Sequence, residues 1–342
     1  MNKTRVLVST STNPWFNLAV EEVIYLKMNP FHRVLFIWRN ADTVVIGRAQ
    51  NPWRECNTER IQQDGITLAR RKTGGGAVFH DLGNTNFTFM AGKPEYNKSV
   101  STQIVIDALK TFNIDAEANG RNDLVIKDGD ILKKFSGSAY REAKDRGFHH
   151  GTLLINADLS RLENYLTPNP KKLAAKGITS IKSRVTNLNL VNPRITHQGV
   201  SDALILAYLE YYNEDKNPNI EIEYISPKSL STLPNLEQTF SEYSQWNWNF
   251  GKTPQFTHAM DERFSWGGIE VYLNITNGII EEANLYTDSL DPTPFESLSE
   301  LLVGVHYDKD SINTLIDNLL TENQDSQDQI NEFQIWFIGE IE

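Results

Sequence analysis

The densest run of residues that could carry out chemistry is Arg-Arg-Lys-Thr-Gly-Gly-Gly-Ala-Val-Phe-His-Asp-Leu-Gly-Asn at positions 70–84. Three consecutive glycines between two strand-like runs remove every side chain from a tight connection, so backbone N–H groups can approach an anion closely. The cations of Arg70, Arg71 and Lys72 precede these glycines. The run predicts a site for a carboxylate or a phosphate; the alternative is a flexible turn with incidental arginines. It matches neither the P-loop nor the Gly-x-Gly-x-x-Gly dinucleotide turn.

A second set of candidates lies at positions 120–141. Asp123, in Gly-Arg-Asn-Asp-Leu, is a hard oxygen ligand that could hold Mg²⁺ against phosphates. Lys134 lies in a predicted strand, where its small neighbours leave room for a ligand. Taken singly, each charge is more typical of a protein surface than of a site.

The adjacent His149 and His150 suggest a metal site. Neighbouring residues on a strand point to opposite faces, so the two rings cannot easily chelate one ion. The sequence also contains no His-Glu-x-x-His motif. Zinc catalysis is therefore not favoured.

Length and composition limit the class of protein. The 342 residues predict two domains with ample material for a core. With 39% hydrophobic and 23% charged residues, disorder, collagen and coiled coil are excluded. No stretch approaches the ~20 apolar residues that cross a bilayer, so we expect no membrane partner and no cleaved signal. The single cysteine, Cys56, excludes an intrachain disulfide and a Cys-based zinc site and favours a reducing, cytoplasmic location.

The net charge of −11 is unevenly distributed. Residues 245–342 contain 3 Lys and Arg against 18 Asp and Glu, which leaves 30 against 26 in residues 1–244. Between Glu163 and Asp202 every charged residue is basic. Such a stretch attracts anions, and a phosphate-bearing ligand, an acidic protein partner or a solvated surface would each explain it. We expect no nucleic-acid partner, because the chain is acidic and the stretch lacks interleaved aromatic residues.

The apolar periodicity predicts a large domain in which strands outnumber helices. Because the strand runs lie in hairpin-like clusters, the expected fold class is α+β, a mixed, mostly antiparallel sheet with packed helices. The composition changes at Trp246, and Thr-Asn-Gly at 276–278 between two apolar runs predicts a hairpin. We therefore expect a large domain at 1–245 and a small, acidic α+β domain at 246–342. Strands are predicted at 5–9, 34–38, 43–46, 67–71, 77–80, 86–90, 124–126, 134–140 and 150–156, and helices at 14–28, 57–64, 99–113 and 197–212.

Together, these motifs resemble those of lipoate-protein ligase A in its bacterial two-domain form, within the biotin and lipoate ligase superfamily. The resemblance runs from Trp-Phe-Asn-Leu-Ala at 15–19 to Trp-x-Trp-x-Phe-Gly at 246–251. One departure is Lys72-Thr73, where the bacterial enzyme often has a serine pair, although Thr73 keeps a hydroxyl. The other shared motifs are the run at 70–84, Gly-Arg-Asn-Asp-Leu, Ser-Gly-Ser-Ala-Tyr-Arg, His-His-Gly-Thr-Leu-Leu, Lys-Leu-Ala-Ala-Lys-Gly-Ile-Thr-Ser and Arg-Val-Thr-Asn-Leu.

The resemblance implies an ATP-dependent, adenylate-forming ligase. Such enzymes convert lipoate and ATP, with Mg²⁺, to lipoyl-AMP and pyrophosphate. They then pass the lipoyl group to a lysine of an apo lipoyl domain, in E2 subunits of 2-oxoacid dehydrogenases or in the glycine cleavage H protein. The mixed anhydride already reacts with an amine, so the protein needs no nucleophile and has to position, neutralise charge and exclude water.

The resemblance also implies the residues of the site. Lys134 would be catalytic by bridging the lipoate carboxylate and the α-phosphate, and Asp123 would hold Mg²⁺. The stretch 171–184 would close over the adenylate, and the acidic domain would be a cap that moves between the half-reactions. ATP would be bound by Arg71, Gly76, Ala77, Val78, Phe79, Asn84, Asp123 and Lys134. Lipoate would be bound by Glu21, Phe36, Trp38, Arg71, Thr73, Gly74, Gly75, Val78, His80, Lys134, Tyr140, Arg141, Phe148 and His150.

Three alternatives remain at this stage. An octanoyl or lipoyl transferase shares the fold but works through a cysteine thioester, and Cys56 lies away from the ligand motifs. A biotin ligase would need a Gly-Arg-Gly-Arg loop, which is missing. A lipoate-binding protein with a decayed site would not need Asp123 and Lys134.

Overall fold

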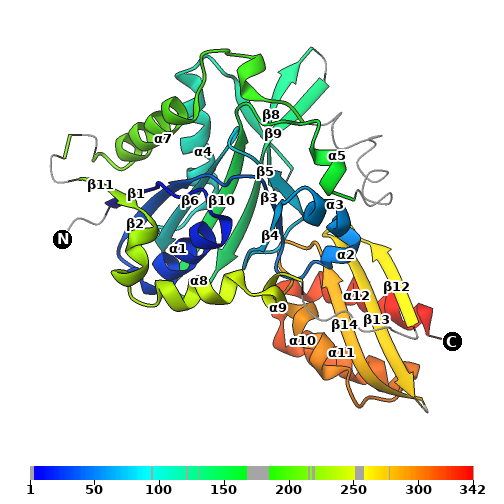
Figure 1. Cartoon of the computed structure of the whole chain (residues 1–342). Coiled ribbons are helices and arrows are strands. Elements are labelled where there is room, and N and C mark those ends of the chain that lie inside the picture. Colours follow the sequence, from blue (N-terminus) through cyan, green and yellow to red (C-terminus); the bar gives the residue numbers. More distant parts are fainter. Residues whose placement is uncertain are drawn as a thin grey trace.

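A computed structural model describes residues 4–93, 95–120, 122–129, 131–167, 185–214, 216–217, 220–250, 258–276 and 278–341 of the chain. Its central feature is a sheet of eight described strands (Figure 1). The strand nearest the N-terminus, Thr4–Ser9, is parallel to both of its neighbours, and all other pairs in this sheet are antiparallel. This confirms the expected mixed, mostly antiparallel sheet. The strand order is β11 (Ile222–Ile225), β1 (Thr4–Ser9), β2 (Arg33–Trp38), β6 (Asn84–Gly92), β10 (Arg146–Leu154), β9 (Ile131–Glu142), β8 (Asp123–Asp128) and β7 (Ala116–Asn119).

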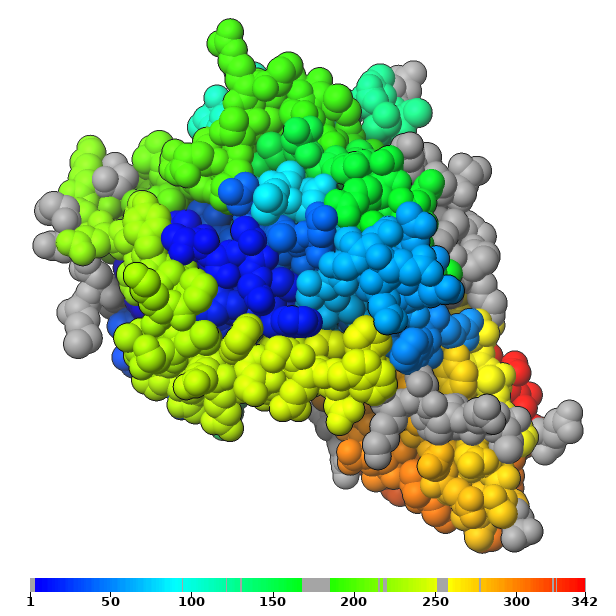
Figure 2. All heavy atoms as spheres, viewed as in Figure 1, coloured from blue at the N-terminus to red at the C-terminus, as the bar shows by residue number. Residues whose placement is uncertain are grey.

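Each face of this sheet packs against a pair of helices because apolar side chains alternate along the strands. On β2, Leu35 and Ile37 join one core, whereas Phe36 and Trp38 join the other. The first core lies under α4 (Lys98–Lys110) and α7 (His197–Tyr211), and the second lies under α1 (Pro14–Lys27) and α8 (Leu236–Ser244). The predicted start of α1 is confirmed, because the Asn13 side chain accepts a hydrogen bond from Phe16 N. Figure 2 shows residues 220–250, in yellow-green, along the edge of α1, in blue.

A separate three-stranded sheet packs on the α1 face of the large sheet. It consists of β4 (Thr67–Arg70), β3 (Thr43–Ile46) and β5 (Val78–His80), in that order. Val45, Ala69 and Val78 join the core that contains Trp38. Short helices α2 (Pro52–Glu55), α3 (Thr58–Gln63) and α5 (Leu162–Tyr165) flank this sheet. The triple glycine therefore connects β4 to β5 above the large sheet.

The C-terminal part has its own sheet and its own core. The predicted hairpin is confirmed, since β13 (Gly268–Thr276) pairs antiparallel with β14 (Ile279–Thr287), and β12 (His258–Arg263) completes the sheet. Helices α10 (Thr293–Leu301), α11 (Lys309–Glu322) and α12 (Gln327–Glu340) pack on it. The boundary at 245 stays a prediction; α9 (Trp246–Asn249) contacts β4 of the large domain. Within the described part of the chain, no helix is long and apolar enough to span a bilayer.

Candidate functional site

A cavity of about 250 Å³ lies between the large and small sheets. The large sheet contributes residues of β6, β9 and β10, and the small sheet contributes β5 and the glycine connection between β4 and β5, residues 74–76. The cavity therefore brings together residues from motifs that are far apart in the sequence. The predicted site residues that line it are Trp38, Arg71, Gly75, Gly76, Ala77, Val78, Phe79, His80, Asn84, Asp123, Lys134 and His150.

Arg71 holds the glycine connection in place. Its Nη2 donates to the carbonyl oxygens of Gly74 and Gly76 at 2.8 and 2.9 Å, and its Nε donates to Thr73 Oγ1 at 3.0 Å. Gly75 has a φ of +91°, which favours glycine. Burial lowers the pKa of Arg71 to about 10, so the guanidinium stays charged at neutral pH. Arg71 thus sets the shape of the loop at the edge of the cavity.

The neighbouring cations do not face the cavity. Arg70 donates to five backbone carbonyls, those of Gly47, Arg48, Gln50, Trp248 and Asn249. Lys72 forms an ion pair with Glu242 at 2.9 Å and lies 4.0 Å from the centroid of the Trp248 ring. Neither side chain lines the cavity. The expectation that both cations would add charge to an anion site is wrong. Arg70 is bound to backbone carbonyls, and Lys72 is paired with Glu242 of α8.

Lys134 and Asp123 form the charged end of the cavity. Lys134 Nζ lies 2.6 Å from Asp123 Oδ1, and the Asp123 side chain is buried. Gly137 provides the space for this ammonium, since a Cβ there would lie 2.7 Å from Lys134 Nζ. The backbone of Lys134 also pairs with Val185, which lines the cavity. The predicted closing stretch at 171–184 lies outside the described residues.

The opposite end is apolar. Trp38, Val45 and Val78 line it together with Leu18. Phe36 stacks on Trp38 at 6.1 Å between ring centroids but does not reach the cavity. This end suits the hydrocarbon part of a ligand, and the charged end suits a carboxylate or phosphate.

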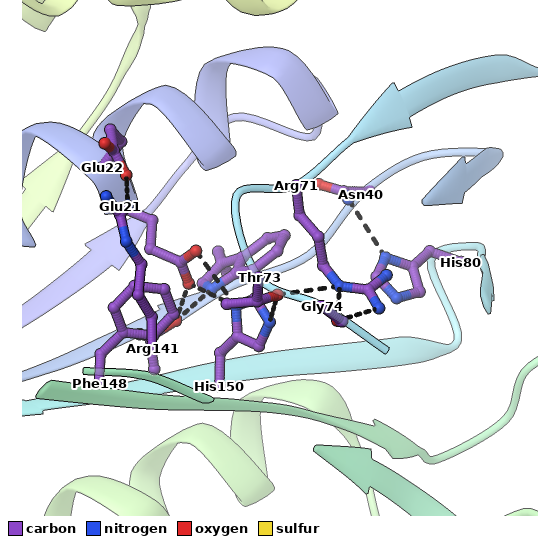
Figure 3. Close-up of polar contacts among 12 residues, drawn as sticks. Glu21, Glu22, Asn40, Arg71, Thr73, Gly74, His80, Arg141, Phe148 and His150 are labelled. Carbon is purple, nitrogen blue, oxygen red and sulfur yellow. Dashed lines mark hydrogen bonds and ion pairs between the residues drawn. The ribbon is translucent and has the colours of Figure 1, made fainter. Parts of the chain in front are cut away.

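A chain of hydrogen bonds joins the glycine connection to the wall of the apolar end (Figure 3). Arg71 Nε donates to Thr73 Oγ1, which also forms a hydrogen bond with His150 Nε2 at 3.0 Å. On the other side of the ring, His150 Nδ1 lies 2.9 Å from the Glu21 carboxylate. Thr88 donates to the same carboxylate at 2.6 Å. Thr73, His150 and Glu21 therefore form one buried, hydrogen-bonded unit, of which His150 lines the cavity.

Several predicted lipoate-binding residues do not line the cavity. Arg141 pairs with Glu22 on α1, Tyr140 lies 4.6 Å from His149 between ring centroids, and Phe148 packs against Tyr25. His149 accepts or donates a hydrogen bond with Ser101 Oγ on the opposite face from His150. The predicted residues outside the lining are Glu21, Phe36, Thr73, Gly74, Tyr140, Arg141 and Phe148, and their binding roles stay predictions.

Residues outside the predicted set also line the cavity. Asn86 and Thr152 are direct partners in the pairing of β6 with β10, and Ser136 lies next to Gly137 on β9. Asn84 Oδ1, Asn86 Nδ2 and Ser136 Oγ are buried and have no hydrogen-bond partner among the described residues. The spacing of Asn84 and Asn86 by two on one strand was a signal that could have found Asn86.

The donor set limits which metal the site could take. Among the described residues, no group of three or more His, Cys, Asp and Glu side chains could hold an ion. Asp123 supplies one carboxylate next to the cavity. One carboxylate fits Mg²⁺ that is bound mainly through nucleotide phosphates and water, and does not fit a dedicated metal cage.

The C-terminal domain rests directly on the glycine connection. Gly75 N donates to the Ser289 carbonyl at 2.9 Å, and a Cβ on Gly74 would lie 2.3 Å from that oxygen. Arg48 forms an ion pair with Glu296 of α10 at 2.6 Å. The loop at the cavity edge is therefore part of the contact between the two parts of the chain.

Comparison with known proteins identifies the class. The family model of the lipoyl protein ligase A/B catalytic domain matches residues 13–209, and that of the bacterial lipoate protein ligase C-terminus matches residues 253–337. The chain belongs to the lipoate protein ligase family. It is an enzyme of lipoate ligation, as the resemblance predicted.

Solved structures agree with this assignment. LipL1 of P. falciparum, in complex with lipoate, is 35% identical over 98% of this chain and 100% of its own, with a TM-score of 0.84. A bipartite lipoate protein ligase of Thermoplasma acidophilum, solved with its E2 lipoyl domain, is 28% identical over 75% of this chain and 100% of its own, with a TM-score of 0.63. A lipoate-protein ligase A bound with ATP is 28% identical over 73% of this chain and 99% of its own, with a TM-score of 0.60.

Proposed function

We propose that this chain activates lipoate with ATP to form lipoyl-AMP and then transfers the lipoyl group to a lysine of an apo lipoyl domain. The observation that carries the proposal is the single cavity that joins an apolar end at Trp38 to a charged end at Lys134 and Asp123. The glycine connection forms one edge of this cavity. A fatty acid with a polar head fits this division between the two ends.

In the first step, a carboxylate oxygen of lipoate attacks the α-phosphorus of ATP, the bond to the β-phosphate oxygen breaks, and pyrophosphate leaves. Lys134 would contact both the carboxylate and the α-phosphate, where negative charge gathers in the transition state. Backbone N–H groups of 76–79 would bind the nucleotide phosphates, with Arg71 holding their loop. Asp123 and Asn84 would hold Mg²⁺ and phosphate, and the ion would neutralise charge on the phosphates.

In the second step, the amine of the acceptor lysine attacks the lipoyl carbonyl, an amide forms, AMP leaves and the amine loses a proton. No cysteine takes part. Cys56 is buried in the core around β3 and does not line the cavity. Burial raises the pKa of the Cys56 thiol, so a reactive thiolate would be disfavoured there.

The acceptors we propose are lipoyl domains of 2-oxoacid dehydrogenase E2 subunits and the glycine cleavage H protein. The relative from Thermoplasma acidophilum is described together with an E2 lipoyl domain, which supports the first of these. We place the reaction in the cytoplasm, where a lone buried cysteine stays reduced.

Lipoate-dependent exchange of labelled pyrophosphate into ATP tests the activation step, and later addition of an apo acceptor domain tests the transfer. We expect exchange only with lipoate and Mg²⁺ present, and acceptor lipoylation only after ATP has been supplied. Exchange without lipoate, or lipoylation from an acyl donor without ATP, would contradict the proposal and favour a transferase.

A further inference from the structure

The Arg70 guanidinium divides its hydrogen bonds between two separate segments of backbone. Its Nη1 donates to three carbonyl oxygens of the turn at 47–50, at 2.7–3.2 Å. Its Nε and Nη2 donate to the carbonyl oxygens of Trp248 and Asn249, at 2.8 and 2.9 Å. Burial lowers the pKa of Arg70 to about 10, so the side chain stays charged at neutral pH. One planar, charged fork therefore holds both segments at once.

The 47–50 turn supports the glycine connection from behind. Arg48 N donates to the Thr73 carbonyl oxygen at 2.8 Å. Gly47 packs so closely against the connection that a Cβ there would lie 2.2 Å from the Gly75 carbonyl oxygen. Because backbone meets backbone at this point, a shift of the turn must shift the connection as well. The position of the turn therefore sets the position of this edge of the cavity.

The C-terminal domain is connected to the same guanidinium in two ways. The domain rests on the turn, since Thr287 N at the end of β14 donates to the Ala49 carbonyl oxygen at 2.7 Å, and Glu296 of α10 pairs with Arg48 at 2.6 Å. The chain also runs into the domain from α9, whose residues 248–249 accept from the guanidinium. Both the contact surface of the domain and its covalent connection thus depend on one side chain.

We infer that Arg70 is a positioning residue that couples the docking of the C-terminal domain to the shape of the glycine connection, and so to nucleotide binding. This rests on the proposed function, in which backbone N–H groups of 76–79 bind the nucleotide phosphates. Because the fork fixes the turn relative to α9, the ion pair of Glu296 can hold the turn in place. Without the fork, the domain is no longer fixed relative to the turn, and its contact ceases to position the connection. A lysine does not replace Arg70, because one nitrogen cannot serve the turn and α9 together.

The test is a double-mutant cycle, read as the KM for ATP in lipoate-dependent pyrophosphate exchange. Glu296→Gln removes the ion pair between the domain and the turn, and Arg70→Lys keeps the charge but removes the fork. We expect KM to rise about threefold to fivefold in Glu296→Gln and about tenfold in Arg70→Lys, with kcat changed less than about twofold in both. Glu296→Gln added to Arg70→Lys should raise KM no further.

Arg60→Lys is the matched control, because Arg60 lies on α3 and pairs with Asp64, four residues further along the chain. In this background Glu296→Gln should have its full effect on KM. If Arg70 were only structural, Arg70→Lys would lower the thermal midpoint but leave the two effects on KM multiplicative. An equal effect of Glu296→Gln with and without Arg70→Lys, or no effect of Glu296→Gln in the wild type, overturns the inference.

A ¹⁵N spectrum of protein labelled at arginine decides if Arg70→Lys does not fold. Glu296→Gln acts on the turn, whereas Arg70 Nε donates to Trp248 on the other side of the fork. Coupling through the guanidinium predicts that Glu296→Gln shifts the Nε signal of Arg70. An unmoved Nε signal would mean that the two segments are held independently, which contradicts the inference. Failure of the proposed function is distinguishable, because it would appear as absent pyrophosphate exchange in the wild type, whereas the spectrum needs no activity.

Discussion

The two walls of the cavity are held in place by different means. The wall on the large sheet, here called the rigid wall, consists of β6, β10 and β9. β6 and β10 pair along their full length, and β9 pairs with β10 over 138–142 and with β8 over 131–137. The opposite wall, here called the loop wall, is the glycine connection of residues 74–76. It is held by the guanidinium of Arg71 and by a hydrogen bond from Gly75 N to Ser289 of the C-terminal domain. The adjacent Thr73 adds hydrogen bonds with Arg48 N and with His150.

We therefore expect the wall on the large sheet to position the reacting groups and the glycine connection to control how ligands enter. Lys134 lies on β9, where residues 131–137 pair with β8, so we expect its ammonium to depend less on the C-terminal domain than the glycine connection does. The glycine connection depends on a contact between domains and would change shape if that contact opened. Substitutions in the rigid wall should therefore slow the chemical step, whereas substitutions in the loop wall should first alter ligand binding and the domain contact.

The largest effect is expected at Lys134. Lys134→Ala should lower the rate of lipoyl-AMP formation by roughly 10²- to 10³-fold, because the lost charge matters most where negative charge gathers at phosphorus. Lipoate affinity should fall much less. Lys134→Arg should not restore the rate, since the planar fork of arginine is larger than an ammonium. Single-turnover formation of lipoyl-AMP, with lipoate affinity measured in parallel, checks both variants.

A wild-type adenylation rate in Lys134→Ala would show that the rigid wall does not supply the cation. Transfer from supplied lipoyl-AMP to an apo acceptor separates the two half-reactions in the same variant. The thermal midpoint of the protein without ligand should fall in Lys134→Ala, because the buried Asp123 carboxylate loses this ion pair.

A smaller effect is expected in the loop wall. In Gly74→Ala, the new Cβ would lie 2.3 Å from the Ser289 carbonyl oxygen, so the two backbones must separate. We expect a loss of stability of about 1–3 kcal/mol, as for other overpacked sites, and faster amide exchange at Gly75. Gly339→Ala is the control, because nothing lies within 4 Å of a Cβ there. Equal exchange at Gly75 in both variants would mean that the domain contact does not hold the loop.

Much of this arrangement could be predicted from the sequence, because it depends on local patterns. The alternation in 34–38 placed Phe36 and Trp38 on one face, and Asn13-Pro14 marked the start of α1. The glycine run indicated the loop between two strands that the structure contains. These features need only neighbouring residues to be specified.

The orientation of the charged and polar side chains could not be predicted. A cation before a glycine loop can face a ligand or bind backbone carbonyls, and Arg70 binds carbonyls from 47–50 and 248–249. The pairing of His80 with Asn40 likewise joins residues 40 positions apart. Such contacts depend on tertiary packing, which leaves no periodic signal in the sequence.

The domain contact should also respond to pH, with a still smaller effect. Glu270 on β13 lies 3.4 Å from Arg54 of the large domain, and burial raises the pKa of its carboxyl to about 7. Between pH 4.5 and 7 the unfolded chain releases this proton more readily than the folded one, so stability falls as pH rises through that window. The loss attributable to this group should be on the order of 2 kcal/mol.

Measurement of the free energy of unfolding at pH 5 and pH 8 checks this expectation. Glu270→Gln cannot ionise, so its stability should change less between the two pH values than that of the wild type. The same pH dependence in both proteins would assign the effect to other groups and leave the domain contact insensitive to pH.

The smallest effect on catalysis is expected at Cys56, which lies in the core behind the small sheet that carries the loop wall. Cys56→Ser should keep ligation near the wild-type rate, because attack on lipoyl-AMP needs no thiol. It should lower stability by about 1–3 kcal/mol, since a hydroxyl replaces a thiol among apolar side chains. Cys56→Ala separates the two effects, because it also lacks the thiol but introduces no polar group. Both variants are assayed for ligation at a temperature at which they are folded. If both lose turnover there, the acyl group is carried by the cysteine. The side of the cavity behind the loop wall would then take part in the chemical step, which we expect of the rigid wall alone.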